Sequence, residues 1–305
     1  MEILVFGAGS LGSLVGGLLA RVHDVTLVGR DPHVAAVNGD GLRITGVESV
    51  VVRPSATTDA TGASADLALV TVKAHDTEVA ARTLATGDYD AVCSLQNGMG
   101  NEDALAGAVD APVFGGTTTY GARLADPGHV EWTGRGTITV GAWRSVDNAA
   151  TAERVATAFR AADLDAATTA DIRTRLWEKL AINAAINPVT ALARVENGAL
   201  TEGPLAGLAR RAAVEAAGVA RAGGADLDDG TARGAVETVA RETARNRSSM
   251  LQDVTRGRRT EIDAINGYVV DRAATTGASA PINRTLASLV RGWEADAGVR
   301  TPERE

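Results

Sequence analysis

Residues 2–30 read EILVFGAGSLGSLVGGLLARVHDVTLVGR, and this stretch decides the fold of the first half of the chain. An apolar run, a glycine turn, a helix-like stretch and a second apolar run follow one another, which predicts a strand–turn–helix–strand unit. In such a unit Gly7 permits the tight turn, Gly9 lets the backbone approach a pyrophosphate, and Gly12 lets the helix pack against the strand. The free amides at the helix start attract the phosphate. We therefore predict a dinucleotide site at Gly7, Ala8, Gly9, Ser10, Leu11 and Gly12.

The end of the second predicted strand bears on which cofactor binds. An NAD site usually places a carboxylate there for the ribose hydroxyls, whereas this strand ends in Gly29 and Arg30. A small residue followed by arginine suits a 2′-phosphate, so we predict NADP(H) with Arg30 as a ligand. Asp31 follows directly and keeps NAD(H) open. Alternatively, Arg30 is a solvated loop cation.

Two further polar residues follow apolar runs that read as buried strands. Lys73 comes after residues 67–72, and Asn97 comes after residues 91–95. Ligands of doubly wound sheets gather at the carboxyl ends of the strands, so both residues are predicted to line the site. A plain turn is the other interpretation of Asn97 and the glycine that follows it.

The pattern of the chain changes after Ala170. Before it, residues 129–142 alternate around glycines and predict an antiparallel hairpin that closes the sheet. Beyond it, the sequence reads as several helices with glycine breaks. The length of 305 residues suggests two domains. We predict an α/β protein with a doubly wound dinucleotide-binding domain at 1–168 and an all-helical substrate domain at 169–305.

Lysine is rare in this chain. It occurs only at Lys73 and Lys179, whereas arginine occurs 28 times. Arginine does not release its proton at physiological pH, but an ammonium group can donate one. The two lysines are therefore the first candidates for proton chemistry, unless they are a chance remnant of a biased composition.

Lys179 begins a stretch, residues 179–192, that contains no other charged residue. A helix that is apolar on all sides is a buried helix, yet Lys179, Asn183 and Asn187 recur at i, i+4 and i+8 on one face. An unpaired buried polar group costs about 1–3 kcal/mol, so this row predicts a ligand pocket beside the helix. Alternatively, the asparagines bond neighbouring helices and Lys179 reaches solvent. Pro188 also biases Asn187 toward a helix end or a kink.

The segment around Glu261 has a purely structural interpretation. Gly257 is expected to end one helix, and Thr260 with Asp263 three residues later is expected to cap the next. Glu261 would then lie in the first turn, where an anion suits the helix dipole.

Composition limits the partners and the compartment. The net charge of −8 and the pI near 5.2 disfavour binding to nucleic acid or to a membrane surface. Cys93 is the sole cysteine, so no internal disulfide forms, and the four histidines show no metal-ligand spacing. No basic leader precedes the first apolar run, and no apolar stretch reaches the roughly 20 residues of a spanning helix. We predict a soluble cytoplasmic protein without a metal.

Seven motifs, in order and at similar spacing from Met1 to about Trp293, resemble those of the ketopantoate reductase (2-dehydropantoate 2-reductase) family. They are GAGSLG, TVKAHDT, QNGMG, GTTTYGA, LWEKLAINAAINPVTAL, ENGAL and SSMLQD…TEIDAINGY. The resemblance implies a Rossmann domain followed by a helical domain of the 6-phosphogluconate dehydrogenase C-terminal type, with the active site in the cleft between them. It also implies NADPH-dependent reduction of 2-dehydropantoate to (R)-pantoate, a step toward pantothenate and coenzyme A.

The resemblance also implies roles for individual residues. Lys179 would be the general acid that protonates the ketone oxygen, and Glu261 would contact the substrate and the cofactor-side hydroxyls. The implied substrate contacts are Asn97, Asn183, Asn187, Asn197 and Ser249. The implied cofactor contacts are Lys73, Asn97 and Glu261, together with the glycine loop and Arg30.

Other functions stay open at this point. One is a related NAD(P)-dependent 2-oxo or 3-hydroxy acid dehydrogenase of the same architecture. Another, from a different class, is a dinucleotide-binding redox sensor without catalysis. A homodimer and feedback inhibition by coenzyme A are further hypotheses.

Overall fold

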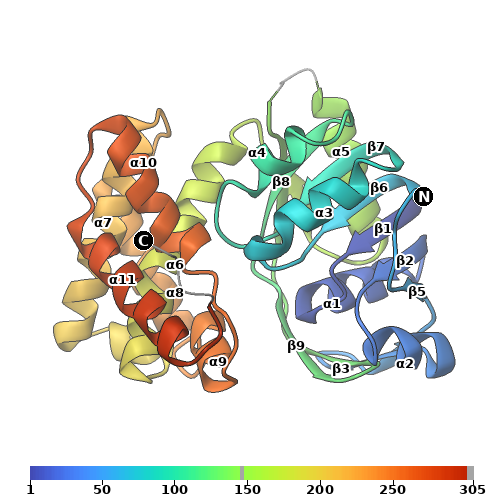
Figure 1. Ribbon diagram of the computed structural model, residues 1–305, viewed down its shortest axis with the longest axis horizontal. Helices are drawn as coiled ribbons and strands as arrows, with labels where there is room; N and C mark the ends of the chain where they lie inside the picture. Colours follow the sequence, from blue (N-terminus) through green and yellow to red (C-terminus); the bar gives the residue numbers. More distant parts are fainter. Residues whose placement is uncertain (145–147, 301–305) are drawn as a thin grey trace. The chain divides into compact units, whose positions relative to one another are not determined.

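The computed structural model describes residues 1–144 and 148–300 (Figure 1). The chain folds into two compact units. Unit 1 consists of Met1–Gln96 and Asn101–Ile172, and unit 2 consists of Asn97–Gly100 and the chain from Arg173 onward. Unit 1 contains the sheets and unit 2 is helical, so the predicted class, an α/β domain followed by an all-helical one, is confirmed. The predicted boundary after residue 168 stays a prediction.

Unit 1 is built from two sheets and the helices that cover them. Its strands are β1 (Glu2–Phe6), β2 (Asp24–Val28), β3 (Leu42–Gly46), β4 (Val50–Val52), β5 (Ser55–Thr57), β6 (Ser64–Val70), β7 (Asp88–Ser94), β8 (Val113–Thr118), β9 (Gly121–Asp126), β10 (His129–Gly134), β11 (Ile138–Ala142) and β12 (Ala166–Thr168). Its helices are α1 (Ser10–Leu19), α2 (His33–Asp40), the short 3-10 turn η1 (Ala74–Asp76), α3 (Thr77–Leu84), α4 (Asn101–Ala106) and α5 (Ala149–Ala161).

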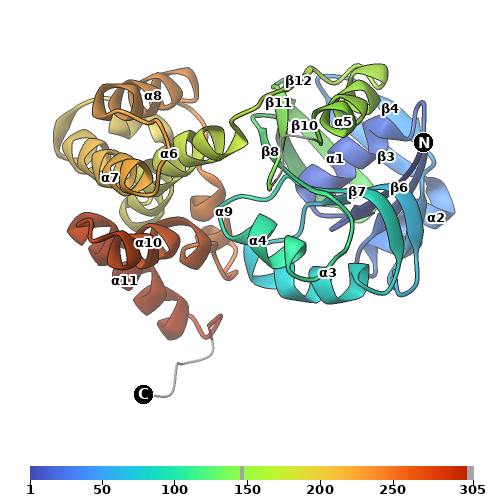
Figure 2. The same ribbon diagram turned by 90° about the horizontal axis from the view of Figure 1, so that it is seen from above.

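The larger sheet has the order β12-β11-β8-β7-β6-β1-β2-β5, and the smaller sheet has the order β4-β3-β10-β9. Figure 2 shows α3 and α4 on one face of the larger sheet and α1 and α5 on the other. Strand β1 is parallel to both of its neighbours, β2 and β6. The chain goes first to one side of β1 and later to the other, so the strand order reverses beside β1. Ligands of open α/β sheets bind at such a reversal, at the carboxyl ends of the strands.

Helix α1 lies between the two sheets, and two glycines let it fit there. A Cβ at Gly16 would lie 2.5 Å from the Leu27 side chain of the larger sheet. A Cβ at Gly17 would lie 2.8 Å from the Leu42 side chain of the smaller sheet. Larger residues at these positions would push the sheets apart. Close packing on both sides therefore fixes the position of α1, the helix at whose start the phosphate site is predicted.

The hairpin predicted for residues 129–142 is wrong. Strand β10 pairs with β9 and β3 in the smaller sheet, whereas β11 pairs with β8 and β12 in the larger one. The alternation around the glycines marks two strands correctly. It does not reveal that residues 135–137 carry the chain from one sheet to the other. The close approach at Gly136, where a Cβ would lie 2.4 Å from the Thr119 and Tyr120 backbone, explains the glycine there.

Unit 2 is made of helices and short helical turns. They are α6 (Ile172–Ala193), η3 (Asn197–Leu200), α7 (Gly203–Ala222), α8 (Asp229–Glu242), α9 (Ser249–Thr255), the π-helical turn η4 (Asp263–Gly267), α10 (Tyr268–Thr276) and α11 (Pro281–Asp296). Alanine fills much of the interior, because aromatic residues make up only 3% of the chain; on α7 the buried alanines include Ala206, Ala209, Ala212, Ala213, Ala216, Ala217 and Ala220. Within the described ranges, no helix combines the length and apolarity needed to cross a membrane.

Candidate active site

The glycine turn sits at the carboxyl end of β1, beside the reversal of strand order. The backbone amides of Gly7 and Ala8 both donate to the carbonyl oxygen of Val28, at 3.0 and 2.8 Å. The hydroxyl of Thr71, just after β6, donates to the carbonyl oxygen of Gly7 at 2.8 Å. Both strands that flank β1 therefore hold the turn in place. Gly7 has φ +120°, a conformation that L-residues with a side chain rarely adopt.

The start of α1 fits a phosphate group. Gly9 occupies the N-cap position with no side chain bonded to the first amides, and the first turn carries no acidic residue. Gly9 is exposed, and a Cβ there would meet nothing closer than 4.0 Å. Uncapped amides at a helix N-terminus attract anions. The residues present therefore fit the pyrophosphate of a dinucleotide.

Arg30 follows β2 at the same edge of the sheet. Its side chain is 88% exposed and forms an ion pair with Asp76 at 3.1 Å. Asp31, which keeps the cofactor assignment open in the sequence, accepts a hydrogen bond from the Ala35 amide in α2 at 3.2 Å. The Asp31 carboxylate is thus engaged with a helix start, while the Arg30 guanidinium extends into solvent.

The loop that carries Lys73 is held by Gln96, a residue for which the sequence predicted no role. It stands at the N-cap of η1, two residues beyond Thr71, and is partly buried. Gln96, two residues beyond the end of β7, donates from Nε2 to the Val72 carbonyl at 3.2 Å and to the Thr77 hydroxyl at 2.7 Å. Gln96 therefore ties the ends of two neighbouring parallel strands together around Lys73. Gln96 could have been recognised from the sequence by its position between a buried strand and Asn97.

The loop Asn97–Gly100 belongs to unit 2 and packs against the segment that contains Glu261. The Asn97 amide donates to Glu261 Oε2 at 3.3 Å, and the Met99 amide donates to the Ala264 carbonyl at 3.1 Å. Gly98 has φ +82°, and a Cβ there would lie 2.6 Å from Ala264. The plain-turn interpretation is thus incomplete, because the loop also brings Asn97 and Glu261 together.

Glu261 is buried, with 6% of its surface exposed. The capping arrangement predicted for the neighbouring residues Thr260 and Asp263 is wrong in part. The Thr260 hydroxyl accepts a hydrogen bond from the Ile262 amide at 3.2 Å, as a cap would. The Asp263 carboxylate does not return to Thr260 and instead pairs with arginines. The amide of Thr260 donates to Glu294 at 2.7 Å. The carboxylate of Glu294 therefore binds the Thr260 amide, which the carboxylate of Asp263 would bind in a capping box.

Lys179, Asn183 and Asn187 all lie on α6, four residues apart, and so share one face. Lys179 and Asn183 are partly buried, and Asn187 is 5% exposed. No hydrogen bond joins either asparagine amide to the described part of the chain, and neither has a polar atom sealed from solvent. The alternative in which these asparagines bond neighbouring helices is therefore not what the structure contains. Two accessible amides without protein partners suit a ligand.

Helix α6 continues through Pro188 to Ala193, so of the two outcomes predicted for Asn187, a helix end or a kink, the helix end is wrong. Proline lacks the amide that would donate to the carbonyl oxygen of Ala184, one turn earlier. Asn266 of η4 replaces that donor, since its Nδ2 donates to the Ala184 oxygen at 2.9 Å. The same amide donates to Asn283 Oδ1 at 2.9 Å, and both asparagines are fully buried. A side chain from a distant segment thus supplies the hydrogen bond that Pro188 cannot make, in the part of α6 that carries Asn183 and Asn187.

We expect Asn266→Leu to lower the free energy of unfolding by about 2–4 kcal/mol, because it leaves two buried oxygens without donors. In a Pro188→Ala background the restored backbone amide can serve Ala184, so the loss should shrink by about 1 kcal/mol or more. Urea unfolding of both single variants and the double variant, followed by circular dichroism, measures this coupling. Additive losses would show that Asn266 does not replace the missing amide of Pro188.

The two remaining predicted substrate contacts lie elsewhere in unit 2. Asn197 begins η3 and is 6% exposed; its Nδ2 donates to the Thr243 hydroxyl at 2.8 Å, while its Oδ1 is buried without a partner. Ser249 is the exposed first residue of α9. The buried serine beside it, Ser248, caps α9 by accepting from the Leu251 amide at 3.1 Å. Contact of Asn197 and Ser249 with the substrate stays a prediction.

Comparison with known proteins identifies the family. The profile described as "Ketopantoate reductase PanE/ApbA" matches residues 3–145, and "Ketopantoate reductase PanE/ApbA C terminal" matches residues 171–294. The chain belongs to the ketopantoate reductase family. It is 44% identical over 298 residues to the 2-dehydropantoate 2-reductase of Archaeoglobus fulgidus, covering 96% of this chain and 98% of that one. It is also 44% identical to the Halobacterium salinarum enzyme of the same name, covering 97% and 100%. The resemblance seen in the sequence is confirmed, and the chain is an oxidoreductase of this family.

Solved structures agree with this assignment. A PanE/ApbA family ketopantoate reductase from Ralstonia eutropha JMP134 superposes with a TM-score of 0.89 at 35% identity, over 98% of this chain and 100% of that one. D-mandelate dehydrogenase in a ternary structure with NADH and anilino(oxo)acetate superposes with a TM-score of 0.92 at 25% identity, over 98% and 100%. The two units of this chain thus occur together in both of these proteins.

Proposed function

We propose that this chain reduces 2-dehydropantoate to (R)-pantoate with NADPH, in the route to pantothenate and coenzyme A. Membership of the ketopantoate reductase family supports the reaction. The observation that carries the site assignment is the α6 face, where one lysine stands in line with two asparagine amides that no described residue bonds. The substrate has a ketone, a hydroxyl group and a carboxylate, and hydrogen-bond donors and acceptors such as this lysine and these amides can bind them.

The proposed mechanism assigns proton transfer to the chain itself. When bound, the dihydronicotinamide supplies the hydride that adds to the ketone carbon. Lys179 Nζ donates a proton to the ketone oxygen as its double bond to carbon becomes a single bond, which prevents a full negative charge from forming. The resulting amine regains its proton from solvent. Asn183 and Asn187 orient the hydroxyl and carbonyl groups, and Glu261 holds the substrate or the ribose side of the site.

The test is steady-state turnover on 2-dehydropantoate with NADPH and with NADH side by side, followed by the loss of nicotinamide absorbance. We expect turnover with NADPH. Tight binding of NADPH with no oxidation against any keto acid would instead favour the redox sensor.

A second candidate function is favoured by one observation. The superposition on D-mandelate dehydrogenase is as close as that on the Ralstonia eutropha reductase, which supports a related 2-oxo acid dehydrogenase. Phenylglyoxylate, the oxo acid that corresponds to mandelate, separates the two candidates. A kcat/KM higher on phenylglyoxylate than on 2-dehydropantoate would favour this second candidate.

Arg30 provides the test of the cofactor. We expect Arg30→Ala to weaken NADPH binding about 10- to 100-fold and to leave NADH binding unchanged, because a hydrogen bond to a charged group contributes about 1.5–3 kcal/mol. Fluorescence titration with both cofactors measures the change. Arg82→Ala, which removes a 69% exposed cation on α3, is the matched control. If the variant still distinguished the two cofactors as the parent does, the 2′-phosphate would have to be held elsewhere.

A cytoplasmic location, a homodimer and feedback inhibition by coenzyme A stay predictions from the sequence.

A further inference from the structure

A fully buried carboxylate lies behind the segment that contains Glu261. Glu294 of α11 has 0% of its surface exposed. Its Oε1 accepts hydrogen bonds from the amide of Thr260 at 2.7 Å and from the Thr260 hydroxyl at 2.6 Å. Its Oε2 accepts from Arg300 at 3.0 Å. Burying a charge is costly unless it is paired and hydrogen-bonded, and here both oxygens are engaged.

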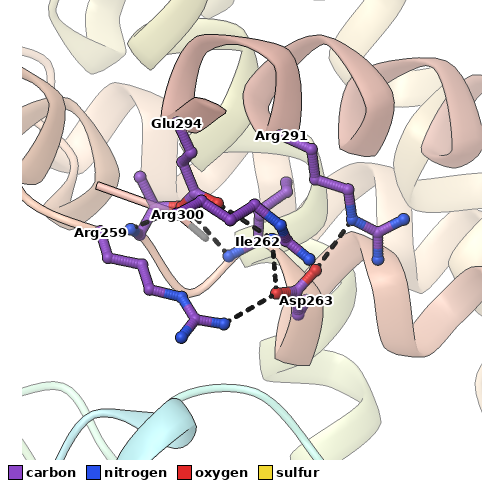
Figure 3. A network of polar contacts seen from close by, with 7 residues as sticks. Arg259, Ile262, Asp263, Arg291, Glu294 and Arg300 are labelled. Carbon is purple, nitrogen blue, oxygen red and sulfur yellow. Dashed lines mark hydrogen bonds and ion pairs between the residues drawn. The ribbon is translucent and has the colours of Figure 1, made fainter. Parts of the chain in front are cut away.

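A second carboxylate, Asp263, is fixed to the same arginine. Figure 3 shows Arg300 between Glu294 and Asp263, with Arg291 and Arg259 reaching Asp263 from other sides. Arg300 and Arg291 approach Asp263 to 2.7 and 2.8 Å. Burial by itself would raise the pKa of Asp263, but hydrogen bonds and charges from Arg300 and Arg291 outweigh it and lower the pKa below its ordinary value. Asp263 therefore stays ionised at neutral pH and keeps its arginines in place.

Glu261 lies between the two anchored residues. On one side, Thr260 is held by Glu294 through both its amide and its hydroxyl. On the other side, the Thr260 hydroxyl accepts from the Ile262 amide at 3.2 Å, and Asp263 is bound by arginines. The Glu261 carboxylate itself accepts from Asn97 at 3.3 Å. The residues on both sides of Glu261 are thus held, Thr260 by Glu294 of α11 and Asp263 by arginines that include Arg300.

We propose that Glu294, supported by Arg300, is a positioning residue that sets the orientation of Glu261 toward its ligand. This inference rests on the proposed function, in which Glu261 contacts the substrate or the ribose side of the site. Glu294 itself takes no part in the chemistry. A gap of about 1 Å at a positioning contact can cost a large factor in rate, so the loss of this anchor should be visible in the kinetics.

The first test replaces Glu294 with glutamine. E294Q keeps an oxygen for Thr260 but turns an amide toward Arg300, so we expect kcat/KM for the oxo acid to fall about 10- to 100-fold. Binding of NADPH should fall less than kcat/KM does, because Glu261 is only one of several predicted cofactor contacts and most of the others belong to unit 1. A second readout needs no turnover: the NMR signal of the Asn97 side-chain amide should shift in E294Q in the same direction as in E261A.

Matched variants separate positioning from stability. Glu237→Gln removes another ion pair of unit 2, with Arg210 at 2.7 Å, and should change neither the kinetics nor the Asn97 signal. If E294Q does not fold, Thr260→Ser and Thr260→Val replace it, since serine keeps the hydroxyl donor to Glu294 and valine removes it. Only the valine variant should move the Asn97 signal.

The outcomes differ for the two claims. A parent protein inactive on every oxo acid would end the proposed function, while the Asn97 signal would still decide the positioning role. Variants that melt at lower temperature but keep normal kinetics and an unmoved Asn97 signal would overturn the positioning role and leave Glu294 as a purely structural anchor.

Discussion

Lys179→Arg is expected to lower kcat for 2-dehydropantoate by about 10²- to 10⁴-fold, the usual contribution of general acid catalysis. Arginine keeps a positive charge near the reacting oxygen, but it holds its proton at any physiological pH. The variant can stabilise negative charge and cannot deliver a hydrogen ion. Dinucleotide binding should be unchanged, because Lys179 is not among the predicted cofactor ligands. Rapid-mixing measurement of nicotinamide oxidation at saturating substrate gives the rate of the chemical step directly.

The control for this variant lies one turn earlier on the same helix. Arg175→Ala removes a cation that is 57% exposed and pairs with Glu178 at 2.9 Å. Exposed pairs of this kind contribute about 0–1 kcal/mol to stability, so turnover and folding should be nearly normal. Lys179→Ala should be at least as slow as Lys179→Arg. Turnover by Lys179→Arg within a few-fold of the parent would exclude Lys179 as the proton donor.

The parts of the fold that could be read from the sequence are those that local patterns determine. The turn at Gly7, Gly9 and Gly12 sits where strand, turn and helix follow one another within thirty residues. Lys73 and Asn97 were placed at strand ends because parallel strands present their carboxyl ends at one edge of the sheet. The α6 face follows from helical periodicity alone. Each of these inferences needs only neighbours in the sequence.

The parts that could not be read depend on partners far away in the chain. The spacing of β10 and β11 is that of a hairpin, and only tertiary pairing assigns them to different sheets. Pro188 indicates a helix end unless a donor such as Asn266, 82 residues away from Ala184, replaces the missing amide. In the same way, the local signal Thr260–Asp263 suggests a capping box, and the carboxylate that binds Thr260 comes from 34 residues later. Long-range polar contacts of this kind leave no periodic trace in the sequence.

Gly12→Ala is expected to abolish measurable dinucleotide binding and to destabilise unit 1 by about 3 kcal/mol or more, the range of severe overpacking. A Cβ at this position would lie 2.1 Å from the carbonyl oxygen of Gly7 and 2.5 Å from the Thr71 hydroxyl. The first contact is with backbone, which cannot move without breaking the turn that Val28 and Thr71 hold. The added methyl group therefore distorts the phosphate site and the α1–β1 packing together. Thermal unfolding and fluorescence titration with NADPH measure the two effects.

Two other alanine substitutions separate the effect on folding from the effect on binding. The atom nearest to a Cβ at Gly9 would be 4.0 Å away, so Gly9→Ala should fold normally. Its affinity for NADPH should fall, because the methyl group occupies the space that the pyrophosphate needs. A Cβ at Gly39, in α2, would meet nothing within 4 Å, so Gly39→Ala should bind normally and fold at least as stably as the parent. If Gly12→Ala instead had the same melting temperature and the same NADPH affinity as Gly39→Ala, that result would show that α1 does not approach the glycine turn closely in solution. The dinucleotide site would then need a different anchor from the one that residues 2–30 predict.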